Sequence, residues 1–160
     1  MRSESGADPG TARDRRRGRP ARRRPDLAYG DTNVFVALLV GPDHRLHERA
    51  LSVFRRVADG ELALIVTPVV AAELVYVAGS VLGWTRSVIA QRMASLLMAD
   101  GLVLTERDPM LRSIGLCEEN SRLDFADAYL AAVALETGPA VVVSFDSDLD
   151  RIEGVRRISA

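Results

Sequence analysis

Four acidic side chains stand at positions where a folded chain could bring them together for chemistry. Asp31 follows the short apolar run at residues 27–29, and Asp146 follows a second apolar run at residues 140–144. The carboxyl ends of parallel strands form the edge of an α/β sheet at which ligands bind. We therefore expect Asp31 and Asp146 to lie at the carboxyl edge of one sheet, although helix capping alone would explain Asp31.

The other two acids lie near the beginning of helical segments that are otherwise apolar. Glu73 is the only charged residue in residues 69–78, and Asp127 begins an apolar helix face one turn after Asp124. An ionised carboxylate in an apolar setting is costly unless it is paired, reaches water or binds a cation. An Arg partner or a solvent-facing side chain would explain Glu73 without any function, and helix capping would explain Asp124.

If the four acids converge, their mutual repulsion favours a bound cation. Ligands that are all oxygen favour a hard divalent ion, Mg²⁺ or Mn²⁺, which completes its coordination with water and substrate phosphate. Such ions activate a water for attack and stabilise the leaving oxygen. The pattern therefore predicts metal-dependent hydrolysis of a phosphodiester.

Apolar runs alternate with helical patterns along the chain. Strands are expected at residues 27–29, 62–66, 102–104, 140–144 and 155–158, and helices at 32–39, after Asp43, at 69–78 behind Thr67-Pro68, at 85–98, from Asp108 to about 119, and after Asp124. Strands that alternate with helices predict an α/β protein, here a three-layer α/β/α sandwich around a central, mostly parallel sheet.

Charge is distributed unevenly along the 160 residues. Residues 1–26 contain nine Arg and four acids, a net charge of +5, whereas residues 27–160 carry −6. Residues 1–26 lack periodicity, so we expect a disordered Arg-rich tail or a mis-assigned start, and residues 27–160 are expected to form one domain. The tail is either a solvated segment or an arm whose Arg residues contact nucleic-acid phosphates.

Composition excludes several classes of protein. The chain contains no Lys, which excludes a P-loop lysine or a Schiff-base lysine. The single cysteine, Cys117, cannot form an internal disulfide. The longest apolar runs are shorter than the roughly 20 residues of a membrane helix, and we expect a cytoplasmic protein without a membrane segment. His44 and His47 have helical spacing but lack a third metal ligand, so surface contacts are expected there.

Four linked motifs resemble the PIN-domain family, and more narrowly the VapC toxins of bacterial toxin–antitoxin pairs. The resemblance covers about residues 27–160, and the motifs lie at residues 31–33, 67–73, 124–132 and 144–150. Gly30 and the Arg-rich extension depart from the compact start that is usual in that family.

The resemblance implies specific roles for these residues. Asp31, Glu73, Asp127 and Asp146 would form the catalytic and metal-binding quartet, and the hydroxyls of Thr32 and Ser144 would orient carboxylates or water. The implied activity is an Mg²⁺- or Mn²⁺-dependent endoribonuclease, the implied partners are an RNA substrate and a cognate antitoxin protein, and a homodimer is expected. We also expect arginines outside the quartet to line the RNA approach, such as Arg86, Arg112 or Arg122.

Two other functions remain open from the sequence alone. A haloacid-dehalogenase-like phosphatase would explain the acidic segment at residues 146–148, but its nucleophile motif belongs near the start of the domain and its Lys is missing. A catalytically inactive PIN-like module that binds nucleic acid would retain the fold and the Arg-rich tail. A full set of four acids argues against such a degenerate site.

Overall fold

A computed structural model describes residues 24–159, so the predicted tail at residues 1–26 lies almost entirely outside the described residues. Three strands form a parallel sheet in the order β1-β2-β3, with β1 at Asp26–Tyr29, β2 at Leu62–Val66 and β3 at Leu102–Leu104. β2 is the central strand, and its residues are almost entirely buried because both of its faces and both of its edges are covered. The predicted α/β class with parallel strands is confirmed.

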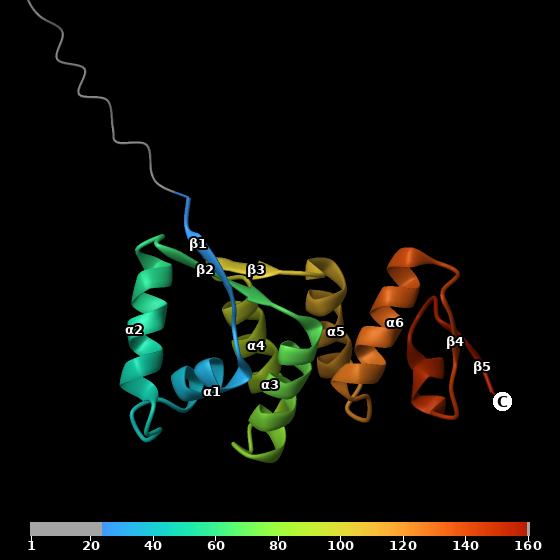
Figure 1. The fold of residues 1–160 in the computed structure, drawn as a ribbon. Coiled ribbons are helices and arrows are strands. Elements are labelled where there is room, and N and C mark those ends of the chain that lie inside the picture. The colour runs from blue at the N-terminus through green and yellow to red at the C-terminus, as the bar shows by residue number, and fades with distance from the viewer. Residues whose placement is uncertain (1–23, 160) are drawn as a thin grey trace, which may run out of the picture.

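In the described part of the chain, six α-helices connect and cover the strands (Figure 1). Their bounds are α1 Thr32–Val40, α2 His47–Ala58, α3 Pro68–Ser80, α4 Arg86–Leu97, α5 Arg107–Glu119 and α6 Phe125–Thr137. None of them, within residues 24–159, is long and apolar enough to cross a membrane.

Local capping determines where several helices begin. The Thr67 hydroxyl accepts a hydrogen bond from the Val70 amide, and Pro68 occupies the first turn of α3, as predicted. The helices expected directly after Asp43 and from Asp108 begin elsewhere: α2 begins at His47, and α5 begins at Arg107, so that Asp108 lies in its first turn and is not its cap. Asp108 stands in the first turn of α5 and favours this helix N-terminus electrostatically.

The last two strands form a separate sheet. β4 at Val141–Val143 pairs in parallel with β5 at Arg156–Ile158, and the short 3-10 helix η1 at Ser147–Arg151 connects them. The expectation that Asp31 and Asp146 follow strands of one sheet was therefore wrong. Figure 1 shows the physical reason: α5 and α6 lie between β1 and the β4–β5 sheet.

Two apolar clusters correspond to the two sheets. The larger one packs α1 to α5 against the first sheet around fully buried residues such as Phe35, Leu74 and Met93. The smaller one packs α6 and η1 against β4 around Leu123, Val142, Leu149 and others. The C-terminal part of the chain thus has a small core of its own.

Gly30 allows the close approach of a core side chain at the end of β1. A Cβ atom at this position would lie 2.6 Å from Cε2 of Phe35, whose ring is completely buried. A larger residue would push that ring out of the core. The glycine that departs from the family's usual start is thus explained by packing directly before Asp31.

Candidate active site

Asp31 follows β1 and begins α1, so its carboxylate stands at the carboxyl end of the first sheet. Its Oδ1 atom accepts a hydrogen bond from the Asn33 amide at 2.8 Å, which caps the helix. The side chain is exposed. The capping bond engages one carboxylate oxygen and holds the group in a defined orientation.

Thr32 links Asp31 to Glu73. The Thr32 hydroxyl, in a residue that is only 6% exposed, donates a hydrogen bond of 2.6 Å to Oε2 of Glu73 on α3. This is a hydroxyl that orients a carboxylate, the role that the family resemblance implied for Thr32. Glu73 itself is exposed, so its charge reaches water and its place in an apolar helix carries little desolvation cost.

Asp127 lies among other acids at the beginning of α6. The Asp124 carboxylate caps this helix and accepts a hydrogen bond of 2.9 Å from the Asp127 amide. Burial raises the pKa of the Asp127 carboxyl, and the negative charges of Asp124 and then Asp146 raise this pKa further. The structure therefore brings Asp127 and Asp146 within electrostatic reach of each other.

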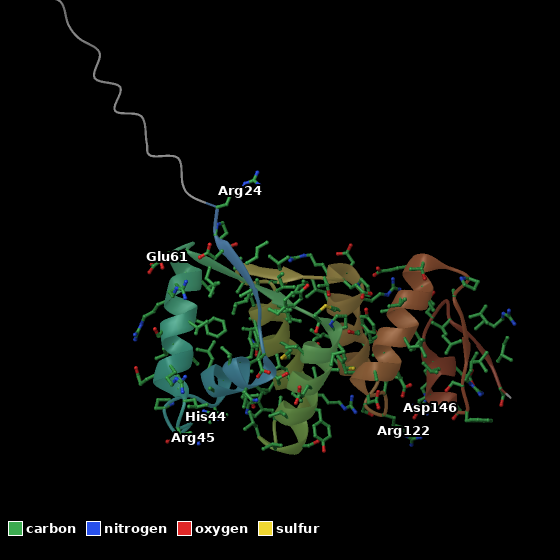
Figure 2. The ribbon with its side chains drawn as sticks, in the orientation of Figure 1. Arg24, His44, Arg45, Glu61, Arg122 and Asp146 are labelled. Atoms are coloured by element: carbon green, nitrogen blue, oxygen red, sulfur yellow. The ribbon has the colours of Figure 1, made fainter. Side chains whose placement is uncertain are left out.

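Asp146 follows β4 and begins η1, and its geometry parallels that of Asp31. Its Oδ1 atom accepts a hydrogen bond of 2.8 Å from the Asp148 amide, and its own amide donates to the Ser144 hydroxyl at 3.0 Å. Ser144 therefore positions the backbone of the acid. In Figure 2 Asp146 lies at the end of the molecule formed by α6 and the β4–β5 sheet, whereas His44 lies near the loop before α2.

The four acids are thus arranged as two pairs. Thr32, the residue after Asp31, donates a hydrogen bond to Glu73, and Asp127 lies within electrostatic reach of Asp146. Within residues 24–159, no group of three or more His, Cys, Asp or Glu side chains is placed to hold a metal ion. The donor chemistry of these carboxylate oxygens suits a hard divalent cation.

The predicted RNA-contacting arginines have different environments. The Arg86 guanidinium donates to the backbone oxygen of Leu123 at 2.6 Å and to that of Cys117 at 3.2 Å, so it fastens the turn between α5 and α6. Arg112 and Arg122 are exposed, and Arg122 lies in the turn before α6 (Figure 2). A contact with RNA remains a prediction for all three.

Sequence reasoning treated Asp124 only as a cap, whereas the structure gives it two further roles. Its charge raises the Asp127 pKa, and its side chain borders a cavity of about 480 Å³ between α3, α4 and the beginning of α6. Trp84 and Phe125 also line this cavity, which is mostly apolar. The i, i+3 spacing of Asp124 and Asp127 at a helix start was the signal that could have indicated their coupling.

Two carboxylates stand at the carboxyl ends of parallel strands, and two more lie in the second turn of α3 and the first turn of α6. This arrangement is typical of an α/β protein of the nuclease type. The family model of the PIN domain matches residues 28–155. The chain belongs to the PIN-domain family, whose members are generally metal-dependent nucleases. This membership decides against the phosphatase alternative. A comparison with curated proteins gave no match.

Proposed function

We propose that this protein is a divalent-metal-dependent endoribonuclease that hydrolyses RNA phosphodiesters with the help of Mg²⁺ or Mn²⁺. The observation that carries the proposal is the placement of Asp31, Glu73, Asp127 and Asp146. Each of them follows a strand or lies in the first two turns of a helix. Among ion pairs between residues 24–159, none involves these four acids.

The Asp127 carboxylate is unfavourable for a structural role alone. The raised pKa of Asp127 indicates that its charged form is destabilised in the metal-free protein by burial and by its acidic neighbours. Perturbed acids of this kind are typical of functional sites. The hydrogen bonds of Thr32 and Ser144 hold two of the acidic segments in place, which supports a site with defined geometry.

We propose the same four residues as the metal-binding and catalytic set. The capping bonds of Asp31 and Asp146 leave each carboxylate an oxygen for another ligand. Arg112 and Arg122 are proposed to attract the phosphate backbone toward these acids, because an acidic site needs nearby cations to bind a polyanion.

The test compares RNA cleavage by the full chain in Mg²⁺ or Mn²⁺ with cleavage in EDTA. Asp31→Asn is the sharpest variant, because asparagine retains the helix cap and removes the charge. We expect its cleavage rate to fall by about 100-fold or more, while Asp100→Ala, a change at an exposed turn, leaves the rate unchanged. RNA binding without cleavage by the unmodified protein would instead support the inactive binding module.

We further propose that the protein is the toxin of a VapBC-like pair in the cytoplasm, forms a homodimer and is inhibited by a cognate antitoxin protein. This proposal rests on the four motifs that resemble VapC toxins. Expression of the chain alone should arrest growth, and Asp31→Asn should not. A small neighbouring gene whose product binds the protein and suppresses both cleavage and growth arrest would establish the pairing. Growth arrest that persists with Asp31→Asn would contradict it.

A further inference from the structure

The cavity of about 480 Å³ beside α6 adjoins two of the four acids. It is lined from α3, α4, α5 and the beginning of α6. Ala72 and Ala126 are among its lining residues, and they directly precede Glu73 and Asp127 along the chain. Its volume lies within the range of ligand sites, about 300–1,000 Å³. The cavity is therefore large enough for a small molecule or for one unit of a polymer that reaches the acids.

Helical spacing also links the cavity to these acids. Tyr76 lies three residues after Glu73 on α3, and Asp124 lies three residues before Asp127 at the beginning of α6. Residues three apart on a helix are neighbours, with about 5–6 Å between their Cβ atoms. Tyr76 and Asp124 both line the cavity. A group bound in the cavity would thus lie next to a group held at the acids.

The cavity has an apolar floor and a polar rim. Ile89, Ala90 and Ile114 line it and are buried, whereas Arg86 and Asp124 line it and are exposed. Apolar sites with a few polar groups orient a ligand through those groups. This cavity therefore suits a flat ligand with apolar faces and a hydrogen-bonding edge.

Three aromatic side chains from different parts of the chain line the cavity, namely Tyr76, Trp84 and Phe125. Tyr76 is 67% exposed, so its ring is free to contact a ligand. Trp84 is held by a cation–π contact, in which Cζ of Arg92 lies 4.5 Å from the ring centroid. Aromatic rings at a nucleic-acid site are surfaces on which unpaired bases stack. A nucleobase is therefore the flat ligand that these side chains favour.

The carboxylate of Asp124 distinguishes between the bases. Its Oδ1 atom accepts a hydrogen bond of 2.9 Å from the Asp127 amide, and an ionised carboxylate can accept further bonds at both oxygens. Guanine presents two adjacent N–H donors on its Watson–Crick edge, whereas adenine and cytosine present a donor beside an acceptor. Uracil presents a donor between two acceptors. A carboxylate accepts only, so guanine is its best match.

Arg86 brings a positive charge to the same rim. Its Nη1 atom donates to the backbone oxygens of Leu123 at 2.6 Å and Cys117 at 3.2 Å, and these bonds fix the side chain beside Asp124. Nε and Nη2 make no hydrogen bond with any other residue of the described range 24–159. These donors are available for a phosphate, which a guanidinium binds strongly.

We propose that this cavity binds a guanine base of the RNA, unstacked from its neighbours, and sets a preference for guanine at the nucleotide beside the cut. Tyr76 stacks on the base, Asp124 accepts hydrogen bonds from its Watson–Crick edge, and Arg86 contacts the adjoining phosphate. The inference rests on the proposed endoribonuclease function for the identity of the polymer. Binding of the base itself does not require cleavage.

The fluorescence of Trp84 provides a test without any measurement of activity, because this residue is the only tryptophan of the chain and lines the cavity. The full chain in EDTA is titrated with short oligouridines that carry 2′-O-methyl groups, which prevent cleavage, and a single guanine, inosine or adenine. We expect guanine to be bound at least about 10-fold more tightly than adenine. Inosine, which lacks the 2-amino donor, should lie between them. Equal affinities, or no saturable change with any oligonucleotide, would overturn the proposal.

Two variants with matched controls assign the roles. Asp124→Asn retains the helix cap and replaces one acceptor by a donor, so the preference for guanine over adenine should fall at least about 5-fold. Asp100→Asn, the same change at an exposed turn outside the cavity, should leave this preference unchanged. Tyr76→Ala should weaken binding of all three oligonucleotides by about 5-fold or more, whereas Met98→Ala, at an exposed apolar residue after α4, should not. A guanine preference that survives Asp124→Asn would overturn the proposal.

Free GMP distinguishes a base of RNA from a free nucleotide. GMP carries the same base without the neighbouring phosphates, so it should bind more weakly than the oligonucleotide that contains guanine. Tighter binding of GMP would assign the cavity to a free guanine nucleotide and would overturn the RNA site.

Cleavage in Mg²⁺ or Mn²⁺ then tests the preference at the cut. The ratio of kcat/KM for substrates with guanine and with adenine should be at least about 10, and Asp124→Asn should lower this ratio. An unmodified protein without cleavage refutes the proposed function and leaves the titrations in EDTA to decide the base site. Cleavage with a ratio near one refutes the base site alone.

Discussion

The hydrogen bond from Thr32 to Glu73 connects the beginning of α1 to α3 and holds the first acidic pair together. Thr32→Val keeps the shape of the side chain and removes the hydroxyl that donates at 2.6 Å to the carboxylate. Hydrogen bonds to charged groups contribute about 1.5–3 kcal/mol. Because Glu73 is exposed and recovers a hydrogen bond from water, we expect a loss near the lower limit, about 1.5 kcal/mol.

A double-mutant cycle isolates this interaction. Thr32→Val, Glu73→Ala and the double variant are unfolded in urea, with the fluorescence of the single tryptophan, Trp84, as the signal. The coupling free energy should be about 1 kcal/mol or more, and Thr32→Val alone should lower the Tm by about 3–6 °C. Thr105→Val, at an exposed position, is the matched control and should change stability by less than about 0.5 kcal/mol.

A coupling below about 0.3 kcal/mol would refute the reasoning, because this value lies within the additivity error of independent sites. It would mean that Glu73 is fully hydrated and that Thr32 contributes nothing to its orientation. Under that result, a slower RNA cleavage by Thr32→Val could not be attributed to a misplaced Glu73.

Three further outcomes follow from packing and titration. Gly30→Ala should destabilise the protein by about 1–3 kcal/mol in urea unfolding, because the new Cβ collides with the buried Phe35 ring, and an unchanged midpoint would contradict the packing. The pKa of Asp127 is raised in the folded state, so the folded protein holds this proton more tightly than the unfolded chain does. The free energy of unfolding of the metal-free protein should therefore fall as the pH rises from the ordinary carboxyl pKa of 3.8 through the raised value. Asp127→Asn should remove this dependence and stabilise the metal-free protein at pH 7, because burial and the acidic neighbours no longer penalise a charge at this position. We expect a gain of at most about 1 kcal/mol, the scale of a solvent-screened interaction, and lower stability of this variant would refute the reasoning. Burial raises the pKa of the Cys117 thiol to about 11, so Ellman's reagent at pH 8 should react with it at least about 100-fold more slowly than with free cysteine, and at an ordinary rate only after unfolding.

Features that depend on a few neighbouring residues could be predicted from the sequence. Thr67-Pro68 begins α3 and Asp124 begins α6, because a capping side chain and a first-turn proline act within one turn of the helix. The buried central strand could also be predicted from its own residues. The run at residues 62–66 is apolar throughout, so both of its faces must be covered. Asp31 and Asp146 lie at strand ends as predicted, and both are also helix caps.

The division of the sheet could not be predicted, because it depends on packing between distant elements. The position of β4 follows from α6, which is held by the bonds from Tyr129 to Glu106 and from Arg86 to the turn before the helix. Neither bond has a signature in the local pattern, since the partners are 23 and 37 residues apart. The strand pattern alone therefore indicated parallel strands and left their partners undetermined.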